Sequence, residues 1–239
     1  MSTPHLLKIA FAIPSARPDV ARVTFREWQK LGYLPAVVLD PKTSTPAQAL
    51  ALANEGVSVT TVQEYKGWAA AVNLLCQEIL PDVDIVVTGG EDQFPDPRYT
   101  ALTYAEQFLQ RFPDLCGIMQ PTGDPFGSKA AAVSPWIGRG WIKRAYKGNG
   151  PLCSTYRHFF ADEELAEVAK LEKVYWERSD MVQEHRHWQR PGHRTRRPVH
   201  MQAAHAAEGK DRILFNERKA KGFPGHELIS IAPTSGSSL

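Results

Sequence analysis

Acidic residues that directly follow an apolar run are the part of this sequence that points most clearly to chemistry. The segment "DIVVTGGEDQFPDP" (84–97) places four apolar or β-branched residues before two glycines, and Glu91 and Asp92 come next. Carboxylates beside flexible glycine backbone suit Mg²⁺ or Mn²⁺, which bind one or two carboxylates together with substrate phosphates. The pattern indicates a metal site formed by Glu91 and Asp92. A turn whose acids face water is the simpler alternative.

A second acidic pair, Asp162 and Glu163, follows "YRHFF" at the start of an expected helix over 161–176. A carboxylate at this position can act as a general base, and aromatic neighbours would raise its pKa towards the working range. Aspartate is equally suited to cap the N-terminus of a helix, and one residue can do both.

Histidines alternate in "DMVQEHRHW" (180–188), where they are His185 and His187. On a strand both side chains would point the same way, and either could reach a manganese ion, which accepts imidazole. A pair of surface histidines is the alternative. A zinc site that also uses His193 and His200 fits no standard ligand spacing.

Strands and helices alternate over the first 125 residues and would position these side chains. The apolar pattern predicts strands over 6–13, 34–40, 57–62, 84–90 and 115–121, and helices over 18–32, 45–56, 66–80 and 99–112. This alternation predicts an α/β fold: a single Rossmann-like domain whose mostly parallel sheet has helices on both faces. Ligands bind at the carboxyl ends of such strands. Polar segments follow those ends here, at 14–15, 40, 89–92 and 121–124.

The regular alternation ends after residue 125. The glycine-rich, basic segment 138–152 is interpreted as a loop or bent strand, and its Gly148–Pro151 part as a mobile loop closing on a diphosphate, with a solvated turn as the alternative. Residues 186–221 hold ten Lys and Arg against three Asp and Glu, a net charge of +7. We expect a catalytic domain over 1–190 (1–125 for the nucleotide sugar, 126–190 for the acceptor), a basic extension over 191–230 and a disordered tail over 231–239.

Composition is that of an ordinary soluble protein, with 43% apolar residues, 23% charged residues and a net charge of +2 over 239 residues. The three widely spaced cysteines, Cys76, Cys116 and Cys153, are typical of free thiols in a reducing compartment. No stretch approaches the ~20 apolar residues of a membrane span, and the N-terminal apolar run is too short for a signal peptide. These features predict a cytoplasmic location.

The order of these motifs resembles the nucleotide-sugar glycosyltransferases of the GT-A fold. "FAIPSARPD" (11–19) is similar to the first strand and nucleotide-binding turn of that family, and Asp40 matches the acid that meets the nucleobase or ribose. "GWAAAVNLL" (67–75) resembles the helix beneath the nucleotide, with its glycine and asparagine six residues apart. "GGEDQFPDP" (89–97) stands in the place of the Asp-x-Asp motif, whose first aspartate falls on Gly90 here. The resemblance covers roughly residues 6–190.

The resemblance implies a metal-dependent transfer of a sugar, most commonly from a UDP-sugar, to an acceptor hydroxyl. It implies Mn²⁺ or Mg²⁺ held by Asp92, with Glu91 and a histidine (His185 or His187) completing the shell. Asp162 or Glu163 would be the base of an inverting enzyme. The donor contacts that it implies are Pro14, Ser15, Arg17, Asp40, Gly67, Asn73, Gly90, Glu91 and Gly150.

The small size and the basic C-terminal segment resemble the phage-type transferases that add sugars to hydroxymethylated pyrimidines in DNA. This resemblance implies a DNA acceptor whose base is flipped out, and the host cytoplasm if the chain is phage-encoded. Trp136, Trp141 and Trp188 are candidates to stack on bases. Glycan, lipid-linked and protein acceptors remain open, as do the sugar and the oligomeric state.

Two other classes compete with this interpretation. A sugar nucleotidyltransferase usually carries a glycine-rich phosphate loop after its first strand, and "PSARPD" (14–19) is not such a loop. A non-catalytic nucleic-acid-binding module would leave the expected convergence of acids without a purpose, and those acids would repel phosphates.

Overall fold

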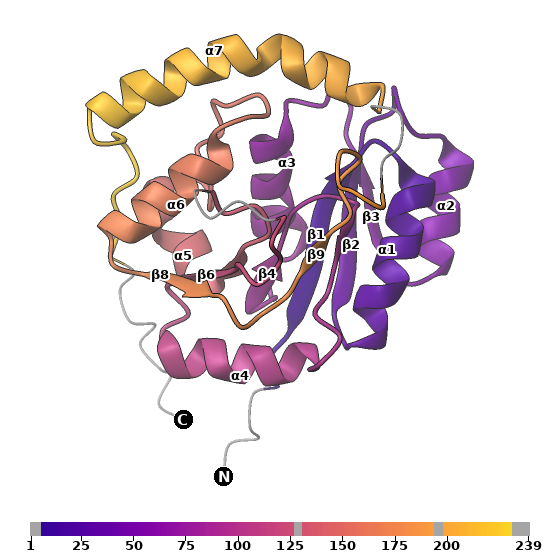
Figure 1. The fold of residues 1–239 in the computed structure, drawn as a ribbon, viewed down its shortest axis with the longest axis horizontal. Coiled ribbons are helices and arrows are strands. Elements are labelled where there is room, and N and C mark those ends of the chain that lie inside the picture. The colour runs from indigo at the N-terminus through magenta and orange to yellow at the C-terminus, as the bar shows by residue number, and fades with distance from the viewer. Residues whose placement is uncertain (1–5, 127–130, 194–197, 231–239) are drawn as a thin grey trace, which may run out of the picture.

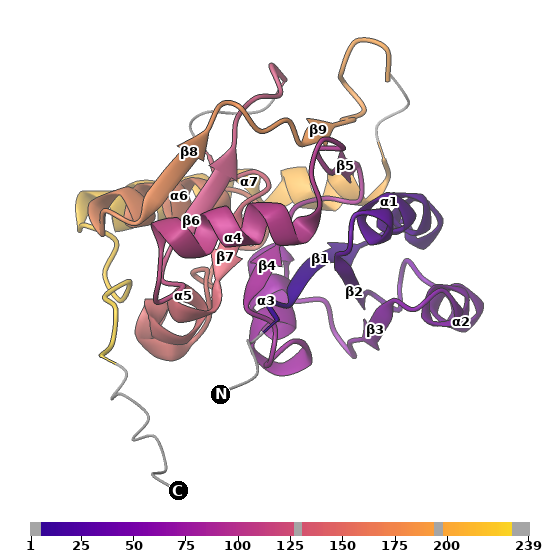
Figure 2. The ribbon, with the colours of Figure 1, turned by 90° about the horizontal axis from the view of Figure 1, so that it is seen from below.

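The computed structural model describes residues 6–126, 131–193 and 198–230. Its main sheet has seven strands in the order β3-β2-β1-β4-β7-β6-β8, and in the described residues only β7 runs antiparallel to its neighbours. Helices cover both faces of this sheet (Figures 1 and 2). The predicted fold class, a mostly parallel α/β domain, is confirmed.

The first half follows the predicted alternation. Its elements are β1 (Ile9–Ser15), α1 (Pro18–Lys30), β2 (Leu34–Leu39), α2 (Pro46–Asn54), β3 (Ser58–Thr61), α3 (Trp68–Leu74), η1 (Leu75–Ile79) and β4 (Ile85–Val87). Local signals explain the helix ends: Thr45 and Gln48 form a reciprocal capping box at the start of α2, and a proline begins both α1 and α2. The predicted helix over 66–80 is α3 continued by the π-helix η1.

Both faces of the central strands are buried, as the sequence pattern predicts for a covered parallel sheet. Ala10 and Ala12 face a core formed with α3 and the later helices, whereas Ile9, Phe11 and Ile13 face a core formed with α1 and α4 (Ala101–Arg111). On that second face the rings of Phe11 and Trp28 stack with centroids 4.1 Å apart. Packing on both faces fixes the positions of β1 and β4, and therefore of the residues that follow their carboxyl ends.

The second half contains β5 (Gln93–Phe94), β6 (Ile118–Pro121), β7 (Trp136–Gly138), α5 (Arg139–Arg144), η2 (Ala145–Gly148), α6 (Ala161–Leu171), β8 (Tyr175–Arg178), β9 (Glu184–His185) and α7 (His200–Ala220). The prediction of a loop or bent strand over 138–152 is wrong, because a strand end, a helix and a 3₁₀ turn occupy it. Arg139 explains the error: its buried guanidinium donates to the backbone carbonyls of Cys76, Leu80 and Val83, at the end of η1. A basic residue thus serves an internal contact rather than a solvated loop.

The predicted helix over 161–176 ends early. α6 stops at Leu171, Lys173 turns the chain with a φ of 60°, and β8 then pairs with β6 as an edge strand. The apolar stripe of α6 continues into the alternating pattern of β8, so periodicity alone did not separate the two elements.

Helix α7 crosses above α3 and α6 in Figure 1 and was not predicted. Buried Asp211 accepts hydrogen bonds from three successive backbone N–H groups, those of residues 157–159, at 2.9–3.1 Å. Arg218 pairs with the fully buried Glu164, which also accepts from the hydroxyls of Tyr146 and Tyr156. These contacts attach α7 to the rest of the molecule. The tail predicted to be disordered, 231–239, lies outside the described residues.

None of the helices in the described ranges combines the length and the apolar character needed to cross a bilayer. This finding agrees with the absence of a long apolar stretch in the sequence.

Candidate functional site

The acid loop, residues 89–93, follows β4 at the carboxyl edge of the sheet. Helix α1 holds this loop from below: Thr24 Oγ1 donates to the carbonyl of Glu91 at 2.5 Å, and Trp28 Nε1 donates to the carbonyl of Gln93 at 2.9 Å. The side chain of Gln93 lies directly against Gly89, so that a Cβ at position 89 would be 1.7 Å from Gln93 Oε1. The backbone that presents the acids is therefore fixed on two sides.

Glu91 is an internal anchor of the site. Its side chain is 7% exposed, and its two oxygens accept from Ser15 Oγ and from Arg17 Nε, each at 2.5 Å. This contact joins the end of β1 to the acid loop. Both carboxylate oxygens are already hydrogen-bonded within the protein, so Glu91 is placed to bind Arg17 rather than a metal ion.

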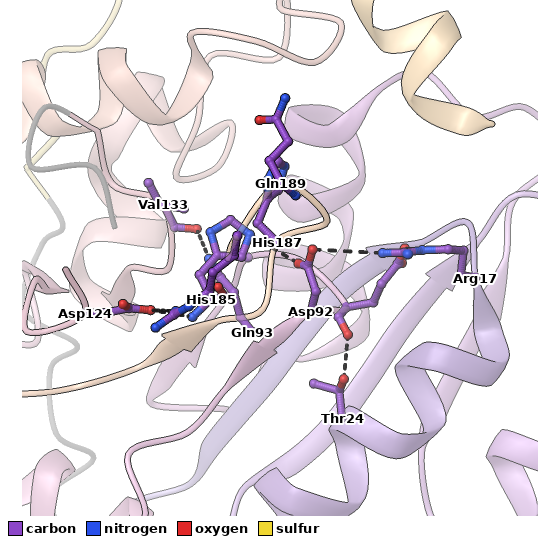
Figure 3. A network of polar contacts seen from close by, with 12 residues as sticks. Arg17, Thr24, Asp92, Gln93, Asp124, Val133, His185, His187 and Gln189 are labelled. Atoms are coloured by element: carbon purple, nitrogen blue, oxygen red, sulfur yellow. Dashed lines mark hydrogen bonds and ion pairs between the residues drawn. The ribbon is translucent and has the colours of Figure 1, made fainter. Parts of the chain in front are cut away.

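Asp92 lies between the histidine segment and Arg17 (Figure 3). Its Oδ1 lies 3.4 Å from His185 Nε2, and its Oδ2 lies 4.0 Å from Arg17 Nη2. Burial opposes ionisation of this carboxyl, but the hydrogen bond and charge of His185, with Arg17 and His187, outweigh burial and lower its pKa. Asp92 is therefore ionised and partly accessible.

A two-stranded ribbon of β5 and β9 brings the histidines to the acid loop. Gln93 pairs with His185, and the backbone N–H of Arg186 donates to the carbonyl of Asp92 at 2.8 Å. The rings of His185 and His187 lie 5.1 Å apart. Burial, and then the proximity of His185, lower the pKa of His187, which keeps its imidazole neutral and able to bind a metal ion.

The fit of a divalent ion can be tested on these atoms. Two ligands at about 2.1 Å from one ion lie roughly 3 Å apart when they are adjacent in an octahedron, and Asp92 Oδ1 and His185 Nε2 are 3.4 Å apart. Among the described residues, no group of three or more His, Cys, Asp or Glu side chains is arranged as a complete metal site. The residues thus fit Mn²⁺ or Mg²⁺ bound by Asp92 and a histidine, with phosphate oxygens and water in the other positions.

The proposed donor contacts fall into two groups. Pro14 and Ser15 end β1 next to Arg17, and Gly90 adjoins Asp92, since a Cβ on Gly90 would lie 2.8 Å from Asp92 Oδ1. The position that carries the first aspartate of an Asp-x-Asp motif is thus too close to Asp92 for a larger side chain without rearrangement.

The other donor candidates lie away from Asp92 or are engaged internally. Asp40 follows β2 and accepts from the backbone N–H of Lys42 at 2.9 Å. Asn73 exchanges two hydrogen bonds with the backbone of Leu152, and Gly150 lies against the Asn73 side chain. The structure therefore brings Asn73 and Gly150 together.

Gly67 begins α3 in a conformation that only glycine accommodates here. Its φ is 120°, and a Cβ would lie 2.2 Å from the carbonyl oxygen of Arg157. Gly67 therefore allows close contact between α3 and the segment before α6. Of the basic residues that precede Gly148, Arg144 points elsewhere: it pairs with Asp114, which comes before β6 at the amino edge of the sheet.

Asp162 and Glu163 begin α6, at the same edge of the sheet as Asp92. The carbonyl of Asp162 accepts from the backbone N–H of Ala132, four residues before the antiparallel strand β7 starts at that edge. Burial, and then the hydrogen bond and charge of Glu163, raise the pKa of Asp162 well above its ordinary value. Glu163 Oε2 is buried without a hydrogen-bond partner in the described structure. Ionisation of Asp162 is therefore disfavoured beside Glu163.

Sequence reasoning missed several residues that shape the site. Asp124 binds the backbone of β9, and Thr24 and Trp28 bind the backbone of the acid loop. Asp124 lies in a polar segment after a predicted strand, which was an available signal. For Thr24 and Trp28 the sequence contains no such signal apart from their position on the buried face of α1.

Two expectations about nucleic-acid contacts are corrected. Trp136 and Trp141 are fully buried in the two cores, so they cannot stack on bases; Trp188 is half-buried. The charge of 186–221 is also largely paired. Five of its ten cations form ion pairs and three lie outside the described residues; the paired ones are Arg186, Arg190, Arg212, Arg218 and Lys219.

Comparison with solved structures finds distant similarity. No protein-family model and no curated protein sequence matches the chain. A Bacillus anthracis structure described as a glucose-1-phosphate thymidylyltransferase in complex with a sucrose is 11% identical, with a TM-score of 0.47 over 72% of this chain and 86% of that chain. HddC from Yersinia pseudotuberculosis is 9% identical, with a TM-score of 0.45 over 72% and 89%. Rv0371c from Mycobacterium tuberculosis, in complex with manganese, is 15% identical, with a TM-score of 0.40 over 73% and 88%. Similarity at this level does not identify an activity.

Proposed function

We propose that the chain is a metal-dependent glycosyltransferase that moves a sugar from a nucleotide sugar, such as a UDP-sugar, to an acceptor hydroxyl. The observation that carries the proposal is the contact between ionised Asp92 and His185 at the carboxyl edge of a parallel sheet, next to Arg17. A carboxylate and an imidazole there can hold Mn²⁺ or Mg²⁺ together with a diphosphate. A bound ion would supply charge neutralisation for the departing diphosphate.

Arg17 supplies a second positive charge beside Asp92. Its Nε is used by Glu91, while the guanidinium remains about one-third exposed and extends towards Asp92. A guanidinium fixed in this way can bind a phosphate oxygen without first being ordered. Ser15 supports it indirectly, because its hydroxyl holds the other oxygen of Glu91. Asp40, at the end of β2, is the proposed contact for the nucleoside.

Asp162 and Glu163 are the proposed acid–base pair. The raised pKa of Asp162 favours a proton on that carboxyl, and the adjacent carboxyl of Glu163 can accept the proton of an acceptor hydroxyl. Their place at the start of α6, at the same sheet edge as Asp92, supports this role.

Hydroxymethylated pyrimidine in DNA is the proposed acceptor. Exposed Arg186 stacks on Phe94 at 3.8 Å from the ring centroid, next to the acid loop, and Arg190 lies 5.7 Å from the centroid of Phe126. Aromatic and guanidinium groups of this kind stack on bases. The extensive pairing of cations in 186–221 argues for a short contact rather than a long basic groove.

The test is a product assay with a matched control. Purified protein is incubated with Mn²⁺ and a panel of labelled nucleotide sugars, with hydroxymethylated or plain DNA, and nucleoside diphosphate release and sugar transfer are both measured. We expect transfer to hydroxymethylated DNA, loss of transfer in Asp92→Asn, and no change in Glu55→Gln, whose carboxylate pairs with Arg22 and Arg26 far from the site.

Other outcomes would redirect the proposal. Pyrophosphate release from a nucleoside triphosphate and a sugar 1-phosphate would replace it with a nucleotidyltransferase. Transfer to a glycan, lipid or protein acceptor would retain the glycosyltransferase and reject DNA.

A further inference from the structure

We infer that Asp124 is a positioning residue, which holds β9 in the register that turns His185 towards Asp92. The inference rests on the proposed function, because it extends the same candidate metal site. Asp124 follows β6, and its side chain is 5% exposed. It lies outside the set of side chains proposed to touch the donor or the ion.

The carboxylate of Asp124 is saturated by contacts to the histidine segment and to its own loop. Its Oδ2 accepts from the backbone N–H of His185 at 2.7 Å and from Arg190 Nη1 at 2.6 Å, and its Oδ1 accepts from the backbone N–H of Phe126 at 3.0 Å. Arg190 Nη1 also donates to the carbonyl of His185 at 3.0 Å. One ion pair thus binds both backbone polar groups of His185.

The ribbon that carries His185 needs such support. β5 and β9 have two residues each, too few to keep a register unaided. A slip of one residue would turn the His185 side chain to the opposite face, away from Asp92. The clamp, defined as Asp124 with Arg190, opposes that slip at His185, whose imidazole lies 3.4 Å from Asp92 Oδ1.

A second buried carboxylate, which follows β5, binds the backbone of the same histidine segment and provides a matched control. Asp96 Oδ2 accepts from the backbone N–H of Val182 at 2.8 Å, and Asp96 pairs with Arg98. It makes the same kind of contact three residues before His185, without touching His185. General loosening of the segment would follow from either substitution, whereas loss of the histidine register would follow only from Asp124→Asn.

The experiment measures Mn²⁺ binding and backbone protection separately. Mn²⁺ affinity is determined by electron paramagnetic resonance for the wild type, Asp124→Asn, Asp96→Asn, His185→Ala and the Asp124→Asn/His185→Ala double variant. Hydrogen exchange of the peptide covering 183–190 is followed in the same proteins. Arg190→Gln removes the other half of the clamp should Asp124→Asn fail to fold.

Asp124→Asn should lower Mn²⁺ affinity by about 10-fold to 100-fold, as loss of an outer contact to a metal ligand does. It should also speed exchange of 183–190 by about 10-fold. Asp96→Asn should leave the affinity at the wild-type value. In the His185→Ala background, Asp124→Asn should cause no further loss, because its effect passes through His185.

Equal losses of affinity in Asp96→Asn and Asp124→Asn, a further loss in the double variant, or unchanged exchange in Asp124→Asn would each overturn the inference. A wild type that binds no Mn²⁺ would instead contradict the metal site of the proposed function. The role of the clamp would then be tested by the hydrogen-exchange rate of the peptide 183–190 alone.

Discussion

Two pairs of adjacent acids, Glu91–Asp92 and Asp162–Glu163, lie at the same edge of one sheet in different electrostatic surroundings. The first pair meets Ser15, Arg17 and His185, and the pKa of Asp92 is lowered in spite of burial. Among the described residues the second pair forms no ion pair with a cation, and burial raises the pKa of Asp162 well above its ordinary value. The neighbours of these two aspartates thus shift their pKa values in opposite directions.

The difference shows how two functions can be divided between similar side chains. A carboxylate with a lowered pKa beside a guanidinium and an imidazole suits a cation and a diphosphate, whereas a carboxyl with a raised pKa suits acid–base work. The predictions below test each side of this contrast, in order of decreasing effect.

Asp92→Asn should abolish transfer, because the amide removes the negative charge that the proposed cation requires. We expect a loss on the order of 100-fold or more in kcat/KM, with an unchanged circular dichroism spectrum. Asp162→Asn serves as the comparison from the other acid pair and should impair transfer while leaving the affinity for Mn²⁺ intact. Turnover of Asp92→Asn at the wild-type rate would remove Asp92 from the site.

Arg17→Ala should destabilise the fold as well as the site. The substitution leaves the buried carboxylate of Glu91 with only the hydroxyl of Ser15 as a partner. An uncompensated buried charge costs roughly 3 kcal/mol, measurable by urea unfolding. Adding Glu91→Gln should restore part of that stability, and a double variant as unstable as Arg17→Ala alone would contradict this account of Glu91.

Asp96 is a third buried carboxyl in this comparison, and its contribution to stability changes at acid pH. Burial would raise its pKa, but hydrogen bonds from Arg98 and from the backbone of Val182 lower it to about 2, against an ordinary value of 3.8. Its stabilisation is therefore complete above pH 4 and is lost as pH falls towards 2, by about 2 kcal/mol. The free energy of unfolding of Asp96→Asn, measured between pH 5 and pH 2, should lack this pH-dependent loss. An equal dependence on pH in the variant and the wild type would contradict the assignment to Asp96.

Asp162→Asn should have the smallest effect on stability, and one of opposite sign. Because the folded pKa of Asp162 is raised, the folded state retains a proton that the unfolded chain releases above pH 3.8, so stability falls as pH rises from there. The variant should therefore gain thermal stability relative to the wild type between pH 4 and pH 8. A Tm difference that is constant over this range would show that Asp162 ionises freely.

The half of the fold that follows local signals could be predicted from the sequence. Apolar strands, prolines at helix starts and the Thr45–Gln48 cap mark β1 to β4 and their helices. The errors concern residues whose partners are distant in sequence. Arg139 is buried against carbonyls about 60 residues earlier, and Arg218 reaches Glu164, 54 residues away. A count of charges cannot distinguish such internal cations from a solvated face.

The candidate site shows the same limit. Asp92 and His185 could be nominated from motif order, but their contact depends on a ribbon of two residues per strand, too short to leave a periodic pattern. The internal use of Glu91 and the clamp at Asp124 depend on tertiary contacts 61 to 76 residues apart along the chain. Residue type suggested the chemistry, and only the fold distinguishes an anchor such as Glu91 from an accessible ligand such as Asp92.

The central claim is that Asp92 holds a cation next to the donor diphosphate. Anomalous diffraction at the manganese edge, from crystals grown with Mn²⁺ and UDP, tests it most directly. The account predicts one manganese peak about 2.1 Å from an oxygen of Asp92, close to the imidazole of His185 and to phosphate oxygens. Bound UDP with the manganese elsewhere, and with Asp92 still facing His185 alone, would contradict it.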